Sequence, residues 1–220
     1  MQNKWSPELV IFDMDGLMFD SENLLFEFYQ QIAPEYGYEV TREFYLETVG
    51  CNAKLVREIT FRLLGEDFPL DEINRRIHEQ IWESLKTTPI RVKPGLYELL
   101  AYLKEEKIPC VVASSSNEEK IRKYLRSAEV EDYFAGIVNG DQVVNSKPAP
   151  DIFLKACEMQ GVKPEKALVL EDSQHGVLAA WRAGIPVICI PDMKYPAPEY
   201  AEKTTAILKD LNEVVDYLRR

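Results

Sequence analysis

Short apolar runs rich in β-branched residues alternate along the chain with longer segments whose apolar positions repeat at the 3.6-residue period of an amphipathic helix. This alternation is typical of an α/β fold in which helices join parallel strands and cover both faces of a doubly wound, Rossmann-like sheet. The apolar runs predict strands at residues 9–13, 109–114, 136–139, 167–171, 187–190 and 205–208, and the helical periods predict helices at residues 96–106, 117–127, 150–160, 174–183 and 212–220.

An unusually long segment separates the first two predicted strands. It has about ninety residues, whereas a crossover between parallel strands needs only a dozen or so. Residues 21–88 show helical periods and no strand signal. We therefore expect two parts: an α/β core made of residues 1–20 and 89–220, and a helical domain of residues 21–88 inserted after the first strand.

The composition limits the partners that this protein can have. In 220 residues, 26 Lys and Arg stand against 37 Asp and Glu, a formal net charge of −11, which repels nucleic acid and anionic membranes. No apolar run approaches the roughly 20 residues of a membrane span, and no basic segment precedes an apolar one at the N-terminus. These features predict a cytoplasmic protein that binds neither nucleic acid nor membranes. The four scattered cysteines favour free core thiols over a disulfide or a zinc site.

Two acidic pairs follow predicted strands. Asp13 and Asp15 come at the end of the first strand, followed by Gly16, which lets backbone approach a ligand closely. Such acids also serve as turn and cap residues, so this segment alone leaves both interpretations open. Glu171 and Asp172 follow the fourth predicted strand, and the carboxyl ends of parallel strands form the ligand-binding edge of an open α/β sheet.

Carboxylates gathered at one edge need a counter-charge. Two like charges about 4 Å apart repel by about 4 kcal/mol at an effective dielectric near 20. A hard divalent cation relieves this repulsion, and Mg²⁺ suits a site of carboxylates, a carbonyl and water. We therefore predict a Mg²⁺ site here. Ser173, the residue after this acidic pair, is predicted to cap the helix that begins at Gln174.

Two further strand ends carry groups suited to an anion. Ser116 and Glu119 fit a capping box for the helix after the second strand, which leaves the Ser114 hydroxyl and the following backbone N–H groups free to hold an anion. Lys147 lies just before another predicted helix. Beside a crevice of carboxylates that admits an anion, Lys147 is the expected counter-charge.

The chain resembles the haloacid dehalogenase superfamily, in its phosphatase and β-phosphoglucomutase-like branch with a helical cap. The resemblance covers the whole chain, since the segment after Asp20 is similar to the four-helix cap of that branch. It rests on four groups of residues in the family's order: Asp13-x-Asp15-Gly16, Ser114, Lys147-Pro148 and Glu171-Asp172-Ser173.

The resemblance implies a phosphatase that acts on a small phosphorylated metabolite. Asp13 would attack phosphorus and form an aspartyl-phosphate, and Asp15 would be the general acid and then the base. The resemblance also implies that Mg²⁺ is bound by Asp13, the carbonyl of Asp15, Asp172 and Glu171. Glu171 would be either a direct ligand or a supporting residue. The phosphate would be bound by Ser114, Ser115 and Lys147.

Residues of the inserted domain help to distinguish a phosphatase from a mutase within this branch. The resemblance implies that a cap loop with Gly50, Asn52 and Lys54 selects the substrate. β-Phosphoglucomutases carry an Arg where this chain has Ala53, and a His at the position aligned with Leu25. Both differences favour a phosphatase, with a phosphosugar mutase as the alternative.

Other reaction classes fit less well. Dehalogenases proper lack the second aspartate of the first motif, which is Asp15 here. Receiver-like phospho-acceptors, a remote alternative, also use Asp and Mg²⁺, but they are about half as long and have no inserted domain. A cap over an acidic core predicts a monomer, and the sequence does not specify the phosphorylated substrate.

Overall fold

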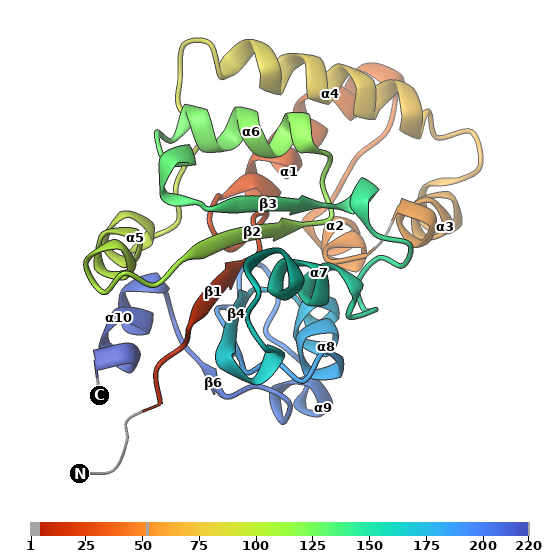
Figure 1. The fold of residues 1–220 in the computed structure, drawn as a ribbon. Helices are drawn as coiled ribbons and strands as arrows, with labels where there is room; N and C mark the ends of the chain where they lie inside the picture. Colours follow the sequence, from red (N-terminus) through yellow and green to blue (C-terminus); the bar gives the residue numbers. More distant parts are fainter. Residues whose placement is uncertain (1–4, 52, 220) are drawn as a thin grey trace.

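The computed structural model describes residues 5–51 and 53–219, and in this part of the chain a parallel sheet forms the centre of the molecule (Figure 1). Its strand order is β3-β2-β1-β4-β5-β6. The doubly wound parallel sheet predicted from the sequence is therefore confirmed. Its strands are β1 (Leu9–Phe12), β2 (Cys110–Ser114), β3 (Gly136–Asn139), β4 (Ala167–Glu171), β5 (Val187–Cys189) and β6 (Ala206–Ile207).

Helices cover both faces of this sheet because successive side chains of a buried strand point to opposite faces. In β1, Val10 and Phe12 pack into one hydrophobic cluster, and Leu9 and Ile11 pack into the other. The first cluster includes α5 (Leu96–Glu105), α6 (Glu118–Ser127) and α10 (Leu211–Arg219), and the second includes α7 (Asp151–Gln160) and α8 (Gln174–Arg182). Shorter elements are η2 (Glu131–Tyr133), η3 (Gly140–Gln142), η4 (Pro164–Lys166) and α9 (Pro198–Ala201).

The described part of the segment between β1 and α5 consists of helices joined by short loops. Its hydrophobic residues join the first cluster of the sheet, as Phe26 and Ile77 do, and Trp82 packs against Tyr124 of α6 with ring centroids 5.9 Å apart. The inserted helices thus pack against the core, and α4 lies next to α6 in Figure 1. They are α1 (Ser21–Ile32), η1 (Ala33–Tyr36), α2 (Arg42–Thr48), α3 (Ala53–Leu64) and α4 (Leu70–Ser84).

One predicted cap is wrong and another is confirmed. The N-cap of α6 is Asn117, whose side chain accepts a hydrogen bond from Lys120 N at 2.9 Å, so Ser116 and Glu119 form no capping box. The helix begins one residue later than a Ser116 cap requires, and the Ser116 hydroxyl donates elsewhere. Ser173 does cap α8, since its Oγ accepts from Gly176 N at 3.1 Å.

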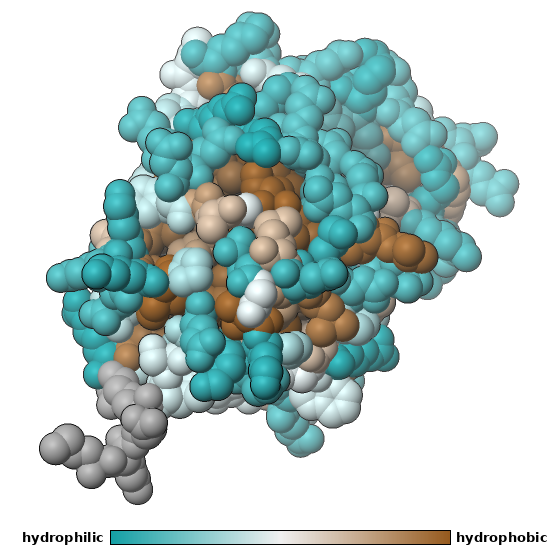
Figure 2. Space-filling model, viewed as in Figure 1, coloured by the Kyte–Doolittle hydropathy of each residue, from teal (hydrophilic) through white to brown (hydrophobic). Residues whose placement is uncertain are grey.

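The surface is largely polar. In Figure 2 hydrophilic residues cover most of the visible face, with hydrophobic residues exposed in patches near its middle. Among the described residues, no helix has both the length and the apolar character needed to cross a membrane. The four cysteines are free thiols, as expected, and three of them are buried: Cys110, Cys157 and Cys189.

Candidate active site

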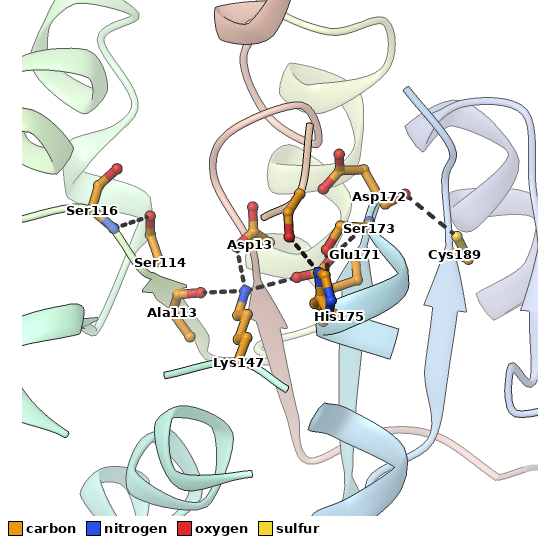
Figure 3. A network of polar contacts seen from close by, with 12 residues as sticks. Asp13, Ala113, Ser114, Ser116, Lys147, Glu171, Asp172, Ser173, His175 and Cys189 are labelled. Atoms are coloured by element: carbon orange, nitrogen blue, oxygen red, sulfur yellow. Dashed lines mark hydrogen bonds and ion pairs between the residues drawn. The ribbon is translucent and has the colours of Figure 1, made fainter. Parts of the chain in front are cut away.

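The carboxyl ends of β1, β2 and β4 bring the predicted site residues together, because these three strands are neighbours in the sheet (Figure 3). Asp13 follows β1, and its backbone N–H donates to the Leu170 carbonyl at 3.0 Å, which holds it beside the end of β4. Ser114 ends β2, and Glu171 ends β4. Lys147 enters from the loop before α7 and points into the same crevice.

Lys147 lies at the centre of this network. Its Nζ donates to Asp13 Oδ1, to Glu171 Oε1 at 2.7 Å, and to the Ala113 carbonyl at 3.4 Å. The ammonium and both carboxylates are buried, with the side chain of Glu171 only 1% exposed. Burial raises the pKa of Asp13 to about 7, and Glu171 adds to this rise while Lys147 opposes it. One lysine therefore does not neutralise the negative charge of the crevice.

Three carboxylates converge closely enough to hold a cation. One oxygen from each of Asp13, Glu171 and Asp172 lies within 4.8 Å of the other two, and all three residues are buried. Burial, together with the charges of Glu171 and Asp13, raises the pKa of Asp172 well above its usual value. A buried group of hard oxygen donors with excess negative charge fits a divalent cation such as Mg²⁺.

Two glycines make room for these acids. Gly16 has φ +83, and a Cβ there would lie 2.4 Å from Asp172 Oδ2. At Gly176, a Cβ would lie 1.7 Å from Glu171 Oε1. Any side chain at either position would displace a carboxylate, so both glycines are needed for the observed arrangement.

Asp15 is held apart from this group by three donors. Its Oδ1 accepts from Ser21 Oγ at 2.7 Å and pairs with Lys120 Nζ at 2.9 Å, and its Oδ2 accepts from Ser116 Oγ at 2.8 Å. Burial acts to raise the pKa of Asp15, but the Lys120 charge and the three hydrogen bonds outweigh it and lower the pKa below its usual value. These donors therefore favour the ionised form of Asp15.

The three donors to Asp15 are not evident from the sequence as site residues. A lysine in the first turn of an exposed helix is usually a solvated charge, so Lys120 carries no distinguishing signal. The Asp20-Ser21 step suggests only the start of a helix. The sequence predicts Ser116 as part of a capping box, which does not form.

The second-strand serines occupy different environments. Ser114 is 1% exposed, and its Oγ accepts from Ser116 N at 3.1 Å, which fixes the turn that leads into α6. Ser115 is exposed in the same turn. The structure thus places the expected anion-binding residues at the edge of the sheet that holds Asp13.

Among the described residues of the predicted cap loop, Gly50 makes a hydrogen bond to the core. The carbonyl of Gly50 is hydrogen-bonded to Nδ1 of His175, near the start of α8. Lys54 is exposed, and Asn52 lies outside the described residues. A cavity of about 120 Å³ lies between this loop and the core, lined by Val49, Cys51, Asp172, Gln174, His175, Met193 and Lys194. His175, which no motif indicated, thus joins the loop to the core.

Comparisons with known proteins bear on the family of this chain. The family model for haloacid dehalogenase-like hydrolases matches residues 10–190. The phosphorylated carbohydrates phosphatase of Thermotoga maritima is 36% identical over 178 residues, which cover 81% of this chain and 82% of the relative. Hexitol phosphatase B of Escherichia coli is 28% identical over 204 residues, which cover 91% and 89% of the two chains.

A solved structure is similar over nearly the whole fold. The crystal structure of CbbY from Rhodobacter sphaeroides in complex with phosphate superposes with a TM-score of 0.78 at 27% identity. The match covers 94% of this chain and 96% of CbbY. The similarity therefore includes both the sheet and the inserted helices.

Proposed function

This chain belongs to the haloacid dehalogenase-like hydrolase family and is a phosphatase, and from this premise we propose that it hydrolyses small phosphorylated metabolites with Mg²⁺ through an aspartyl-phosphate on Asp13. One observation carries the proposal: a buried carboxylate at the end of β1 lies beside a buried lysine and within a group of acids that fits a divalent cation. An anionic nucleophile can attack an anionic phosphate only where such positive charge is supplied.

The reaction proceeds in two displacements. Asp13 attacks phosphorus and forms a P–O bond, while the bond to the leaving oxygen breaks and that oxygen takes a proton from Asp15. Asp15 then takes a proton from water, the water oxygen attacks phosphorus, and the bond to Asp13 breaks to release inorganic phosphate. Ser114, Ser115 and Lys147 bind the phosphate oxygens during both steps.

The surrounding acids have separate roles in this proposal. Mg²⁺, when bound by Asp13, Asp172 and the carbonyl of Asp15, would neutralise charge between the nucleophile and the phosphate. Glu171 is a supporting residue, because both of its oxygens already have partners. Its Oε1 accepts from Lys147 at 2.7 Å, and its Oε2 accepts from Ser173 N at 2.7 Å and Ser173 Oγ at 2.9 Å. Glu171 therefore orients Lys147 and the start of α8.

Asp15 must gain its proton when substrate binds, because its three donors keep it ionised beforehand. For Asp15→Asn we expect turnover of alkyl phosphates to fall about 100-fold or more, but turnover of nitrophenyl phosphate to fall less than about 10-fold. Nitrophenolate is stable enough to leave without a proton, whereas an alkyl leaving group must be protonated as it leaves. The ratio of the two kcat values measures this difference.

A control separates proton transfer from cation binding in that variant. The backbone carbonyl is unchanged, so the rise in Tm on adding Mg²⁺ should match that of the wild type. Equal losses for alkyl and aryl substrates would contradict the acid role of Asp15.

Phosphorylated sugars and polyols are the substrate class we favour, since similar proteins are a phosphorylated carbohydrates phosphatase and a hexitol phosphatase. Residues 21–88 act as a cap on the core of residues 1–20 and 89–220, with the loop of Gly50, Asn52 and Lys54 in contact with the substrate. The protein acts as a monomer in this proposal.

The proposed function is tested with a panel of sugar, polyol and nucleotide monophosphates. We expect inorganic phosphate to be released in Mg²⁺, to stop in EDTA, and to resume when Mg²⁺ is restored. Release that persists at the same rate in EDTA would contradict the role of the cation, and no release from any substrate would contradict the substrate class.

The same panel separates a phosphatase from a mutase. Ala53 is exposed and cannot replace the Arg of the mutases, and Leu25 packs against the hydrophobic cluster and cannot replace their His. With β-glucose 1-phosphate and a catalytic amount of its bisphosphate, we expect inorganic phosphate and little glucose 6-phosphate. Fast isomerisation without phosphate release would make the mutase the better assignment.

A further inference from the structure

Asp192, which lies shortly after β5, has one carboxylate oxygen with a partner and one without. Its side chain is 5% exposed, and its Oδ1 accepts from Lys93 Nζ at 2.6 Å. Its Oδ2 is buried and, over residues 5–51 and 53–219, is the one buried side-chain nitrogen or oxygen that lacks a hydrogen-bond partner. The ion pair with Lys93 therefore satisfies only one of the two carboxylate oxygens of Asp192.

The unpartnered oxygen faces the same space as Asp172. A Cβ on Gly16 would lie 3.3 Å from Asp192 Oδ2 and 2.4 Å from Asp172 Oδ2. Both oxygens therefore face the same space beside Gly16. Asp192 does not belong to the closer group of three carboxylates. Asp192 therefore lies next to the cation site, outside the group of three carboxylates that would hold the cation.

The charges around this space do not balance. A buried polar oxygen without a partner costs about 1–3 kcal/mol, and more when it is charged. Lys93 and Lys147 supply two positive charges against the four carboxylates that converge here: Asp13, Glu171, Asp172 and Asp192. A hydrated divalent cation supplies both the missing charge and the missing hydrogen-bond donor.

We propose that Asp192, oriented by Lys93, is a further residue of the cation site and accepts a hydrogen bond from a water molecule carried by the cation. Mg²⁺ keeps several of its waters when it binds to proteins, and carboxylates that orient such groups contribute to affinity. This inference rests on the Mg²⁺ dependence of the proposed function, and it adds a residue that the four family motifs do not contain.

The variant Asp192→Asn tests this role with a readout independent of catalysis. The asparagine can keep one oxygen for Lys93 while an NH₂ group, which cannot accept a hydrogen bond, replaces the unpartnered oxygen. In EDTA we expect at most a small fall in Tm, because the loss of repulsion with Asp172 offsets the weaker pairing with Lys93. In Mg²⁺ titrations followed by Tm and by calorimetry, we expect apparent affinity to fall about 10-fold or more.

Asp216→Asn is the matched control, because it removes one negative charge from an exposed position on α10. Its response to Mg²⁺ should equal that of the wild type. If Asp192→Asn does not fold, Asp192→Ser is used in the same titrations, with the same loss of affinity expected.

The outcomes distinguish this inference from the proposed function. If the wild type itself gains no stability from Mg²⁺, the cation of the proposed function is wrong, and the inference fails with it. If the wild type and Asp192→Asn respond equally to Mg²⁺, only the inference is overturned. An equal drop in Tm in EDTA and in Mg²⁺ would also overturn it, since that result means that Asp192 serves only its ion pair with Lys93.

Discussion

Replacing Asp13 with asparagine is expected to reduce phosphate release at least about 1000-fold, because the amide has nearly the same shape but cannot act as an anionic nucleophile. The position of Asp13 beside Lys147, at the carboxyl end of β1, is the basis for this expectation. Turnover is measured with the best substrate of the panel in protein freed of other metals. Wild-type enzyme quenched during turnover and reduced with borohydride should carry the reduced residue at position 13.

The matched control for this change is Asp20→Asn. Asp20 belongs to the same loop, but its partners Asn23 and Arg91 lie outside the site. We expect the control to retain turnover within about 3-fold of the wild type, as for substitutions remote from the chemistry. More than a few per cent of wild-type turnover in Asp13→Asn, or a borohydride-reduced residue at another position, would exclude an aspartyl-phosphate on Asp13.

Replacing Lys147 with methionine should damage both stability and activity. Lys147 is 8% exposed and pairs with two buried carboxylates, Asp13 and Glu171. Breaking a buried pair while its partners stay charged costs about 3–5 kcal/mol. The loss of a positive charge beside the phosphate should also reduce turnover about 100-fold or more. Urea unfolding in EDTA measures the first effect, and steady-state kinetics in Mg²⁺ measures the second.

The stability loss in Lys147→Met should depend on pH. The pKa of Asp13 is already raised to about 7 by burial in the wild type, and loss of the ammonium raises it further. A carboxyl group with a raised pKa stabilises the folded state fully below its unfolded pKa, near 4, and this contribution is lost as pH rises through the folded pKa. The variant should therefore be destabilised less at pH 5 than at pH 8.

The control is Lys166→Met, which removes a lysine of the surface pair with Glu8, where both side chains are at least half exposed. Such pairs contribute at most about 1 kcal/mol, so the control should lose little stability at either pH. A similar small loss in Lys147→Met would show that Asp13 and Glu171 do not depend on this lysine.

The sequence by itself determined the sheet and predicted four groups of candidate site residues at its edge. Helices cover both sides of the sheet, so every residue of β4 is buried. Such buried strands appear in the sequence as short, mainly apolar runs. Asp13, Ser114 and Glu171 could be assigned to one edge because each lies at the end of such a run, and parallel strands end together. Element ends were less exact, as β5 stops at Cys189 and Asn117 replaces Ser116 as a cap.

Only the tertiary structure decided which side chains meet across distant segments. Lys120 reaches Asp15 from α6, His175 reaches Gly50 between α2 and α3, and Asp192 shares the space before Gly16 with Asp172. None of these residues follows a local pattern, because a lysine or aspartate near the end of an element is usually solvated. The contacts of Lys120 and Asp192 arise when folding brings buried charges together, and the energy of such groups depends on distance and burial, which the order of residues does not specify.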